Sequence, residues 1–524
     1  MFSPNIHRYL FLFGLFSLAF GLMVGSVPTS VPQFILLGNW IIEGDYKRKF
    51  NLLKTNKLFW IITSIFFLHL IGMLYTENIN DGLTDLRIKL PLLFLPGLLF
   101  SSNPIDVKEF KILLYCFIAG SAVNTGWCLI YNYILHTNDV ARNASRFMSH
   151  IRLGLYLNVA IASCFYFMLQ HAKTVYKMLF GILLLYFIFS LYALGLASGF
   201  VNLSILSAFA LISFLFKQKL YVKLGSIVIL LGVICYMIYY FTSFLNSQLV
   251  VQKTETNSPR MYNAAGNICL NSEISTQKEN GNYVYMNIQT IELQKEWSRR
   301  FPEDSFTYTP PYNLQRYNVL IRYMASKGLY KDSAGISLLS NEDFKNIQNN
   351  ITNYKYPEWG FMQKRIYEFV WEYDEFMNDR SVNGHSLTMR LYFWKAASVI
   401  IKNNLLFGVG TGDVQNQLNK TYVETHSPLS KDWFKRPHNQ FITITVSLGM
   451  FGLLIFLFSF IYPVIKLKKQ IHILFWPYFL ILCISFILED TLETQAGLSF
   501  YAFFYSIFIA QAYYLKKQQN PAGL

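Results

Sequence analysis

The stretch "RPHNQFITITVSLGMFGLLIFL", Arg436–Leu457, places a cation, a proline and a histidine before an uncharged apolar run. That run has about 20 residues, the length that crosses a bilayer as a helix. Similar runs recur along the chain, near residues 9–25, 26–42, 58–75, 86–102, 110–135, 152–170, 178–195, 200–216, 222–245, 440–465, 472–488 and 497–515. The sequence therefore predicts an all-α polytopic membrane protein with about 12 transmembrane helices.

The composition supports this fold class. The chain has 524 residues, of which 53% are hydrophobic and only 14% are charged, which is too apolar for a water-soluble globule. A second apolar run follows the first at once, so we expect the first to be a retained helix and not a cleaved signal peptide. Five cysteines fall in apolar runs and only Cys269 lies elsewhere, which favours neither a disulfide framework nor a metal site.

The positions of the cations predict the orientation. Lysines and arginines cluster in every second short connection, beginning with residues 47–57, and such loops are usually cytoplasmic. Both termini are then cytoplasmic, and the long loop 246–437 faces the periplasm of a Gram-negative cell. The predicted domains are residues 1–245 with nine helices, the loop 246–437, and residues 438–524 with three helices and a cytoplasmic tail. The net charge of +15 belongs mainly to inner loops, so we expect no nucleic-acid partner.

The long loop is rich in aromatic residues, which predicts a folded α+β domain. Residues 280–293 alternate β-forming residues and predict a strand, while 340–350 and 361–377 predict helices. Residues 387–407 have the spacing of an amphipathic helix lying on the membrane surface. The glycines that follow, Gly408, Gly410 and Gly412, indicate either a helix end with a tight turn or a weak phosphate-binding loop.

A few cations break the orientation rule by lying at outer ends of the expected helices: Arg87, Lys89, Arg142, Arg146, Arg152, Arg390 and Arg436. Charged groups at such depth either extend to the lipid headgroups or serve a function. Guanidinium groups suit a diphosphate because their planar fork donates parallel hydrogen bonds to its oxygens. His438 lies on the same predicted face, and an imidazole there can accept a proton from an attacking hydroxyl.

Several stretches together resemble a known family. "RLYFWKAASVIIKNNLLFGVGTGD" (390–413), "RPHNQFI" (436–442) and "SLGMFGLLIFL" (447–457) look like the signature region of the O-antigen ligase and O-antigen polymerase superfamily. "FMSHIRLGLYL" (147–157) and "LEDTLETQAGLSFYAFF" (488–504) are similar to the versions found in Bacteroidota. The resemblance covers most of the chain and is strongest over residues 385–457.

The resemblance implies a GT-C-like glycosyltransferase of the bacterial inner membrane. Such an enzyme takes a glycan from undecaprenyl diphosphate without a metal or cofactor. The family pattern maps its catalytic residues onto Arg152, Arg390 and His438, and we expect a further set to bind substrate: Arg87, Lys89, His150, Arg436 and Asn439. Many relatives have a Ser-Arg pair where this chain reads Ser198–Gly199. The acidic turn Glu489, Asp490 and Glu493 is expected either to orient these groups or to be solvated.

The sequence does not identify the acceptor of the glycan. Transfer to lipid A-core would make the protein an O-antigen ligase, transfer to another lipid-linked glycan would make it a polymerase, and transfer to a protein hydroxyl would make it a protein O-oligosaccharyltransferase. A polysaccharide flippase or another transporter is the alternative outside enzymology. It would be expected to show internal repeats and charges deep within the helices of both halves.

Overall fold

The computed structural model describes residues 4–135, 145–215, 218–272, 277–304, 314–378 and 382–519, and these residues are mainly helical. They form two compact units. Unit 1 comprises Met1–Ser213 and Met389–Leu524, and unit 2 comprises Phe214–Thr388. The boundaries predicted at residues 245 and 437 describe where the chain leaves the membrane, and they stay a prediction.

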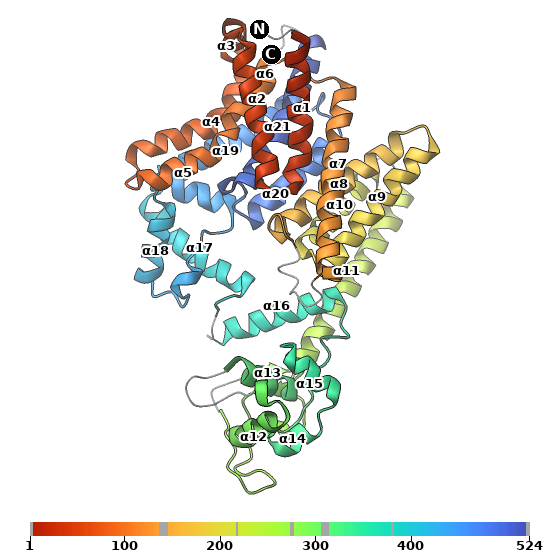
Figure 1. The fold of residues 1–524 in the computed structure, drawn as a ribbon, viewed down its shortest axis with the longest axis vertical. Coiled ribbons are helices and arrows are strands. Elements are labelled where there is room, and N and C mark those ends of the chain that lie inside the picture. The colour runs from red at the N-terminus through yellow and green to blue at the C-terminus, as the bar shows by residue number, and fades with distance from the viewer. Residues whose placement is uncertain are drawn as a thin grey trace. The chain divides into compact units, whose positions relative to one another are not determined.

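The first part of unit 1 is a series of helices, which Figure 1 shows in red to yellow: α1 (Pro4–Val24), α2 (Ser26–Glu43), α3 (Tyr46–Thr55), α4 (Lys57–Gly72), α5 (Ile79–Lys89), α6 (Pro91–Ser101), α7 (Val107–Ile130), α8 (His150–Gln170), α9 (Thr174–Ala193) and α10 (Ala197–Leu215). The second part adds α17 (Ser386–Asn403), α18 (Val414–Glu424), α19 (Gln440–Leu467), α20 (Phe475–Leu488) and α21 (Gln495–Gln519). The last helix, α21, packs against α6, α2 and α1 from the beginning of the chain. The core of unit 1 therefore joins both parts of the sequence.

Among the described residues, 8 helices are long and apolar enough to cross a membrane: Pro4–Val24, Lys57–Tyr75, Val107–Ile134, His150–Gln170, Thr174–Ala193, Ala197–Leu215, Gln440–Leu467 and Gln495–Gln519. The apolar helix α20 is shorter. The polytopic helical class is thus confirmed, and the expected number of about 12 stays a prediction.

The expected span 86–102 is two helices. α5 ends at Lys89 and α6 begins at Pro91, where the proline lacks the N–H that would continue the helical hydrogen bonding. With 11 residues, α6 is about 17 Å long, too short for a hydrocarbon core of about 30 Å. The continuous helix predicted for this segment is therefore wrong.

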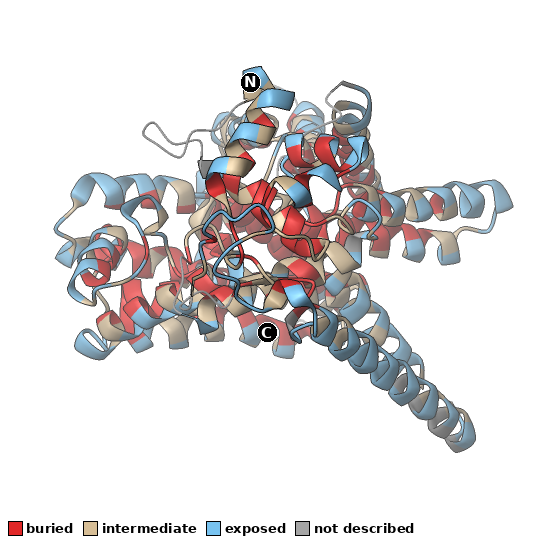
Figure 2. Cartoon of the chain, turned by 90° about the horizontal axis from the view of Figure 1, so that it is seen from below, coloured by how far each residue is buried: buried red, intermediate tan, exposed pale blue. Residues whose placement is uncertain are grey.

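Buried side chains gather in the middle of unit 1, whereas some apolar helices stay exposed (Figure 2). Tyr478, Tyr501 and Tyr505 are among the largest fully buried residues. By contrast, α10 buries only Gly199 and Asn202 along its length. An apolar surface of this kind is what a helix presents to lipid.

The helix α19 is broken at Gly449, whose φ of 68° and ψ of −171° are not helical. The segment after α17 fills the break with backbone hydrogen bonds: Val409 N donates to Val446 O, Gly410 N to Ser447 O, Met450 N to Leu405 O, and Phe451 N to Leu406 O. Backbone groups freed at membrane depth need such partners because lipid offers none. This contact fixes α17 and the beginning of α19 to one another.

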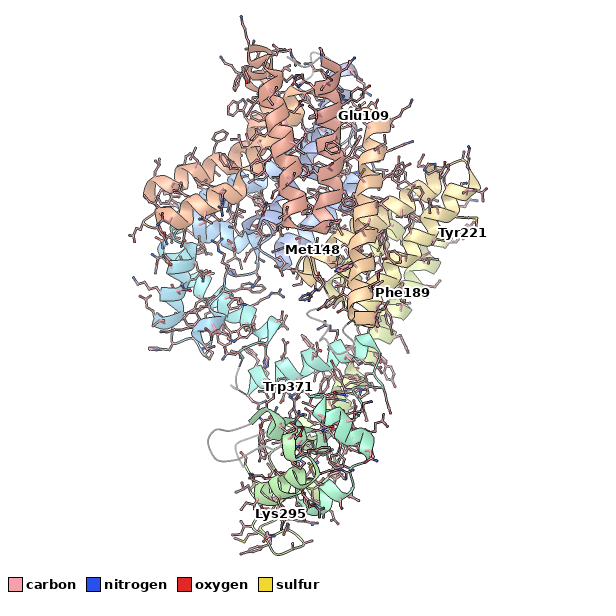
Figure 3. All side chains as sticks on the ribbon, viewed as in Figure 1. Glu109, Met148, Phe189, Tyr221, Lys295 and Trp371 are labelled. Atoms are coloured by element: carbon pink, nitrogen blue, oxygen red, sulfur yellow. The ribbon has the colours of Figure 1, made fainter. Side chains whose placement is uncertain are left out.

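Unit 2 contains α11 (Leu220–Leu249), α12 (Thr290–Arg300), α13 (Leu314–Ser326), α14 (Ser333–Ser337), α15 (Asn341–Gln348) and α16 (Phe361–Met377), and Figure 3 labels Lys295 and Trp371 in it. The helices predicted over 340–350 and 361–377 are confirmed. Ser340 caps α15 in a capping box with Asp343, as its sequence indicates.

The strand predicted over 280–293 is mostly wrong. Only Asn282–Tyr283 (β2) forms a strand, paired antiparallel with Lys278–Glu279 (β1) in the register Lys278↔Tyr283 and Glu279↔Asn282. From Thr290 the chain is helical, because the side chain of Gln289 accepts a hydrogen bond from Ile291 N and caps α12. The described part of the loop is therefore helical with one short hairpin, and the expected α+β character is not confirmed.

Candidate active site

The acidic turn between α20 and α21 is buried. Glu489 and Asp490 are 7% and 6% exposed, and the side chain of Glu493 is 6% exposed. The interpretation of this turn as a solvated acidic loop is therefore wrong. Buried carboxylates need charged or hydrogen-bonding partners, and in this turn each of them has several.

Glu489 is the point at which the predicted catalytic residues meet. Its Oε2 lies 3.7 Å from His438 Nδ1, and its Oε1 lies 3.9 Å from an Arg390 terminal nitrogen. Burial alone would raise the pKa of Glu489, but the neighbouring His438, Arg152 and Arg390 outweigh burial and hold that pKa below its ordinary value. The structure thus places Arg390 and His438 beside one carboxylate, with Arg152 near enough to favour its ionised form.

The two arginines have unused polar atoms. The Nε atoms of Arg152 and Arg390 are buried, and neither has a hydrogen-bond partner among the described residues, whereas Nδ1 of His438 faces Glu489. Arg390 also donates from its terminal nitrogen to Leu488 O at 3.1 Å. Two guanidinium groups therefore lie near Glu489 with polar atoms still available. Such a site suits an anion with several oxygen acceptors.

His438 has an unusual backbone. Its φ is 51°, in the left-handed region that costs a residue other than glycine about 1 kcal/mol. Asp490 stabilises this conformation, since its carboxylate accepts hydrogen bonds from His438 N at 2.9 Å, Asn439 N at 3.1 Å and Thr443 Oγ1 at 2.6 Å. Burial raises the pKa of Asp490, and the hydrogen bond from Thr443 offsets this only in part.

Residues of α17 contact the same turn from another direction. Trp394 Nε1 donates to Pro437 O at 2.9 Å, and the rings of Phe393 and His438 are 5.8 Å apart. Asn439 caps α19 by accepting a hydrogen bond from Ile442 N. Its side-chain amide also donates to Ile487 O at 3.1 Å. Asn439, predicted to bind substrate, therefore makes contacts that hold the turn.

Lys89 and Arg436 belong to a neighbouring ion-pair network. Lys89 Nζ lies 2.6 Å from Asp85 and 2.9 Å from Glu493, and Arg436 lies 2.6 Å from Glu493. The side chain of Lys89 is 1% exposed. The charges of both predicted substrate-binding residues are thus already matched by carboxylates inside the protein.

The remaining predicted residues occupy different positions. Arg87 is exposed on α5, and His150 is half-buried as the first residue of α8, two positions before Arg152. The guanidinium of Arg146 stacks 3.9 Å from the ring of Tyr131, and Arg142 lies outside the described residues.

The absence of an arginine at position 199, where many relatives have a Ser-Arg pair, has a steric reason. A Cβ on Gly199 would come within 2.5 Å of Leu191 and 3.0 Å of the Gly154 backbone. Asn158 also donates to Gly199 O at 2.9 Å. The helices α8 and α10 approach too closely here for an arginine at position 199.

The glycine loop 408–412 has a structural role in this fold. A Cβ on Gly408 would lie 2.5 Å from the Leu448 nitrogen, and one on Gly412 would lie 2.2 Å from Asn78 O. Asp413 then accepts hydrogen bonds from Glu77 N and Asn78 N, both at 2.8 Å. Of the two interpretations of these glycines, the tight turn fits the structure, because the backbone amides of Val409 and Gly410 are bonded to α19.

No group of three or more His, Cys, Asp and Glu residues in the described ranges is arranged to hold a metal ion. The chemistry available at Glu489 is that of an imidazole beside a carboxylate with two guanidinium groups nearby.

Residues 336–457 match the family model described as O-antigen ligase. This match supports an assignment to the O-antigen ligase/polymerase superfamily. The match includes the helix that carries Arg390 and the turn that carries His438. The matched family implies an enzyme that transfers glycans, with a lipid-linked glycan and a glycan acceptor as substrates. Together with the apolar helices it indicates a multi-pass bacterial membrane protein. No curated protein matches the chain at a significant level.

Proposed function

We propose that this protein transfers a glycan from undecaprenyl diphosphate to an acceptor hydroxyl at the periplasmic face of the inner membrane, in the manner of an O-antigen ligase with lipid A-core as acceptor. One observation carries this proposal. His438 and Arg390 lie beside Glu489, Arg152 is near enough to favour its ionised form, and both arginines have a buried Nε without a hydrogen-bond partner among the described residues. A partly buried site with two guanidinium groups beside apolar helices suits a substrate with a diphosphate head and a hydrocarbon tail.

In the proposed reaction His438 accepts the proton of the acceptor hydroxyl while that oxygen attacks the anomeric carbon of the donor glycan. The bond between the anomeric carbon and the diphosphate oxygen breaks, and undecaprenyl diphosphate leaves with the bonding electrons. Arg152 and Arg390 stabilise the charge that develops on this leaving group. Because Nδ1 of His438 faces Glu489, we assign the proton transfer to Nε2.

Glu489 has an auxiliary role in this proposal. Its carboxylate favours a proton on Nδ1 of His438, which leaves Nε2 as the basic atom, and it stabilises the imidazolium that forms. The guanidinium groups supply the charge neutralisation, so we propose that no metal takes part. His150 and Arg87 are proposed to contact the outer part of the donor head. Lys89 and Arg436, whose charges are matched by Asp85 and Glu493, are proposed to support the donor site through these ion pairs.

The proposed topology has both termini in the cytoplasm and residues 246–437 in the periplasm. The face of α17 that carries Leu391 and Trp394 supports a position on the membrane surface, because these residues are 44% and 36% exposed. The neighbouring Leu405, Leu406 and Phe407 are exposed as well. These exposed apolar side chains offer a surface for the polyprenyl tail.

A gene deletion tests the proposed function. The deletion strain is expected to lose one class of surface glycan and to accumulate the lipid-linked donor. Lipopolysaccharide, capsule and glycoproteins are analysed together, so that the missing product identifies a ligase, a polymerase or a protein transferase. The wild-type gene should restore the product, and His438→Ala should not. Full restoration by His438→Ala would exclude the proposed base.

A flippase is the alternative from another class. In that case the deletion strain would retain its lipid-linked donor on the cytoplasmic leaflet. The donor in sealed spheroplasts would then be protected from reagents added outside. Our proposal expects the accumulated donor to be accessible from the periplasm.

A further inference from the structure

One carboxylate contacts both sides of the turn that carries His438. Glu493 Oε2 lies 2.6 Å from a terminal nitrogen of Arg436, which precedes Pro437 and His438. Glu493 Oε1 accepts a hydrogen bond from Gln440 Nε2 at 3.1 Å, just after Asn439. Gln440 Oε1 in turn accepts from Leu492 N at 2.6 Å. The residues before and after His438 are therefore fixed to the same acidic turn.

These contacts matter because of the conformation between them. His438 has a φ of 51°, which a histidine leaves readily unless its surroundings hold it. Asp490 binds the two successive backbone N–H groups at His438 and Asn439. Asp490 thus holds the centre of the turn, and Glu493 holds its ends. Release of the ends would let the backbone relax toward negative φ and carry the imidazole away from Glu489.

Glu493 is itself held in place by a second cation. Lys89 Nζ lies 2.9 Å from it and also contacts Asp85. Burial opposes ionisation of Glu493, but Lys89 and Arg436 outweigh burial and keep its pKa well below the ordinary value. Its side chain is 6% exposed. An enclosed carboxylate paired with two cations acts on the reaction only through its neighbours.

We propose that Glu493 is a positioning residue for the transfer reaction: by binding Arg436 and Gln440 it fixes the backbone conformation that directs His438 toward Glu489. The role of Glu493 in the reaction rests on the function proposed above. The effect of Glu493 on the position of His438 does not depend on that function, because the position can be measured without turnover.

The test is Glu493→Gln, with the protein purified in lipid nanodiscs. The rate at which diethyl pyrocarbonate modifies His438 is followed by mass spectrometry of the peptide. We expect this rate to rise severalfold as the ring leaves the contact with Phe393 and Glu489. His426, an exposed histidine that also has a positive φ of 48°, is the internal control and should react at an unchanged rate.

Turnover is measured on the same preparations, with donor lipid extracted from the deletion strain. A misplaced base should lower kcat by about 10- to 100-fold and leave the KM for the donor within about threefold. Glu109→Gln is the matched control, because it breaks the ion pair between Arg8 and Glu109, which Figure 3 labels at the beginning of α7. Its kcat should be unchanged.

Should Glu493→Gln not fold, Gln440→Met removes one of the two end contacts and should raise the reactivity of His438 by a smaller factor. An unchanged His438 reactivity in a folded variant would overturn the proposal, whatever happens to kcat. Full turnover in His438→Ala would instead overturn the proposed function and leave the reactivity result standing, so the two failures are distinguishable.

Discussion

Arg152 and Arg390 differ from the lysines of unit 1 in how they present charge. Each has a buried Nε without a hydrogen-bond partner among the described residues, so each can add a directed donor to a bound anion. Lys89, in contrast, is surrounded by the carboxylates of Asp85 and Glu493. A planar fork can span two oxygens of a diphosphate, whereas an ammonium group offers a single point of charge.

We therefore expect Arg152→Lys and Arg390→Lys to weaken transfer although both keep the charge. Loss of one bidentate contact should lower kcat/KM for the donor by roughly 10- to 100-fold. Initial rates at varied donor concentration measure this effect. Arg8→Lys, in the ion pair with Glu109 far along the chain from these residues, is the control and should keep its kcat/KM. A wild-type kcat/KM for the donor in both Arg152→Lys and Arg390→Lys would contradict the proposed contact with the diphosphate.

Glu489 gives the stability of the protein a characteristic dependence on pH. Its pKa is lowered in the folded protein, because His438, Arg152 and Arg390 outweigh burial. A carboxylate with a lowered pKa stabilises the fold fully above its ordinary pKa and loses that contribution as the pH falls through the lowered value. The wild type should therefore exceed Glu489→Gln in stability at pH 7, and the difference should shrink below about pH 4. Thermal unfolding across this range measures it, and a difference independent of pH would contradict the account.

The sequence singled out Arg152, Arg390 and His438, because cations at outer helix ends break the charge rule and the family pattern supplies a histidine. It could not predict which cations pair with carboxylates inside the protein. Lys89 and Arg390 look alike as sequence, but Lys89 meets Glu493 from a distant part of the chain. The buried state of the acidic turn likewise depends on packing between α20, α21 and the His438 turn, which no local pattern encodes.

At the scale of elements, the broken helix α19 links the two functional segments. The hydrogen bonds from Val409, Gly410, Met450 and Phe451 join the end of α17, which carries Arg390, to the helix that begins after His438. Gly449 permits this contact, since its φ is 68° and a Cβ there would lie 2.2 Å from Leu406 O. The break is thus a built feature of the fold that holds Arg390 and His438 in register.

Gly449→Ala should accordingly destabilise unit 1 by about 2 kcal/mol or more, through both the strained φ and the clash with the Leu406 carbonyl. Thermal unfolding in detergent, followed by fluorescence-detected size exclusion, reads out the loss. Gly38→Ala in α2 is the matched control because nothing lies within 4 Å of its Cβ position. It should be neutral or slightly stabilising. A Gly449→Ala variant as stable as the control would show that the break is not required.

Elements with a strong local pattern were predicted well, and those that depend on distant partners were not. The capping box at Ser340 and the amphipathic spacing of 361–377 are encoded within a few residues, and both helices form. The apolar run 86–102 reads as one span, yet Pro91 divides it. Residues 280–293 contain β-forming side chains, but the cap at Gln289 and the turn at Asn280–Gly281 leave room for only a short hairpin.

At the scale of the whole molecule, the account depends on topology. The lysine-rich segment 46–55 is predicted to be cytoplasmic, and residues 246–437 periplasmic. Only then do His438 and the arginines reach a donor that has already crossed the membrane. This side assignment rests on the distribution of positive charge among the loops.

Single cysteines in a cysteine-free variant test the topology. Ser258→Cys, exposed in the long loop, should react with a membrane-impermeant maleimide in cells with a permeabilised outer membrane. Thr55→Cys, exposed at the end of α3, should react only after lysis. Labelling of both positions in intact spheroplasts, or the reverse pattern, would place the site on the wrong side of the membrane for the proposed donor.

Purified protein and isolated donor lipid test the central claim most directly, by the release of undecaprenyl diphosphate together with glycan transfer to the acceptor. The account predicts equimolar release and transfer by the wild type in the presence of EDTA, and a rate lower by about 10²- to 10⁴-fold in His438→Gln. His426→Gln, which alters an exposed histidine of the same loop with a similar backbone conformation, should turn over normally. A His438→Gln enzyme within about twofold of the wild-type rate would contradict the account.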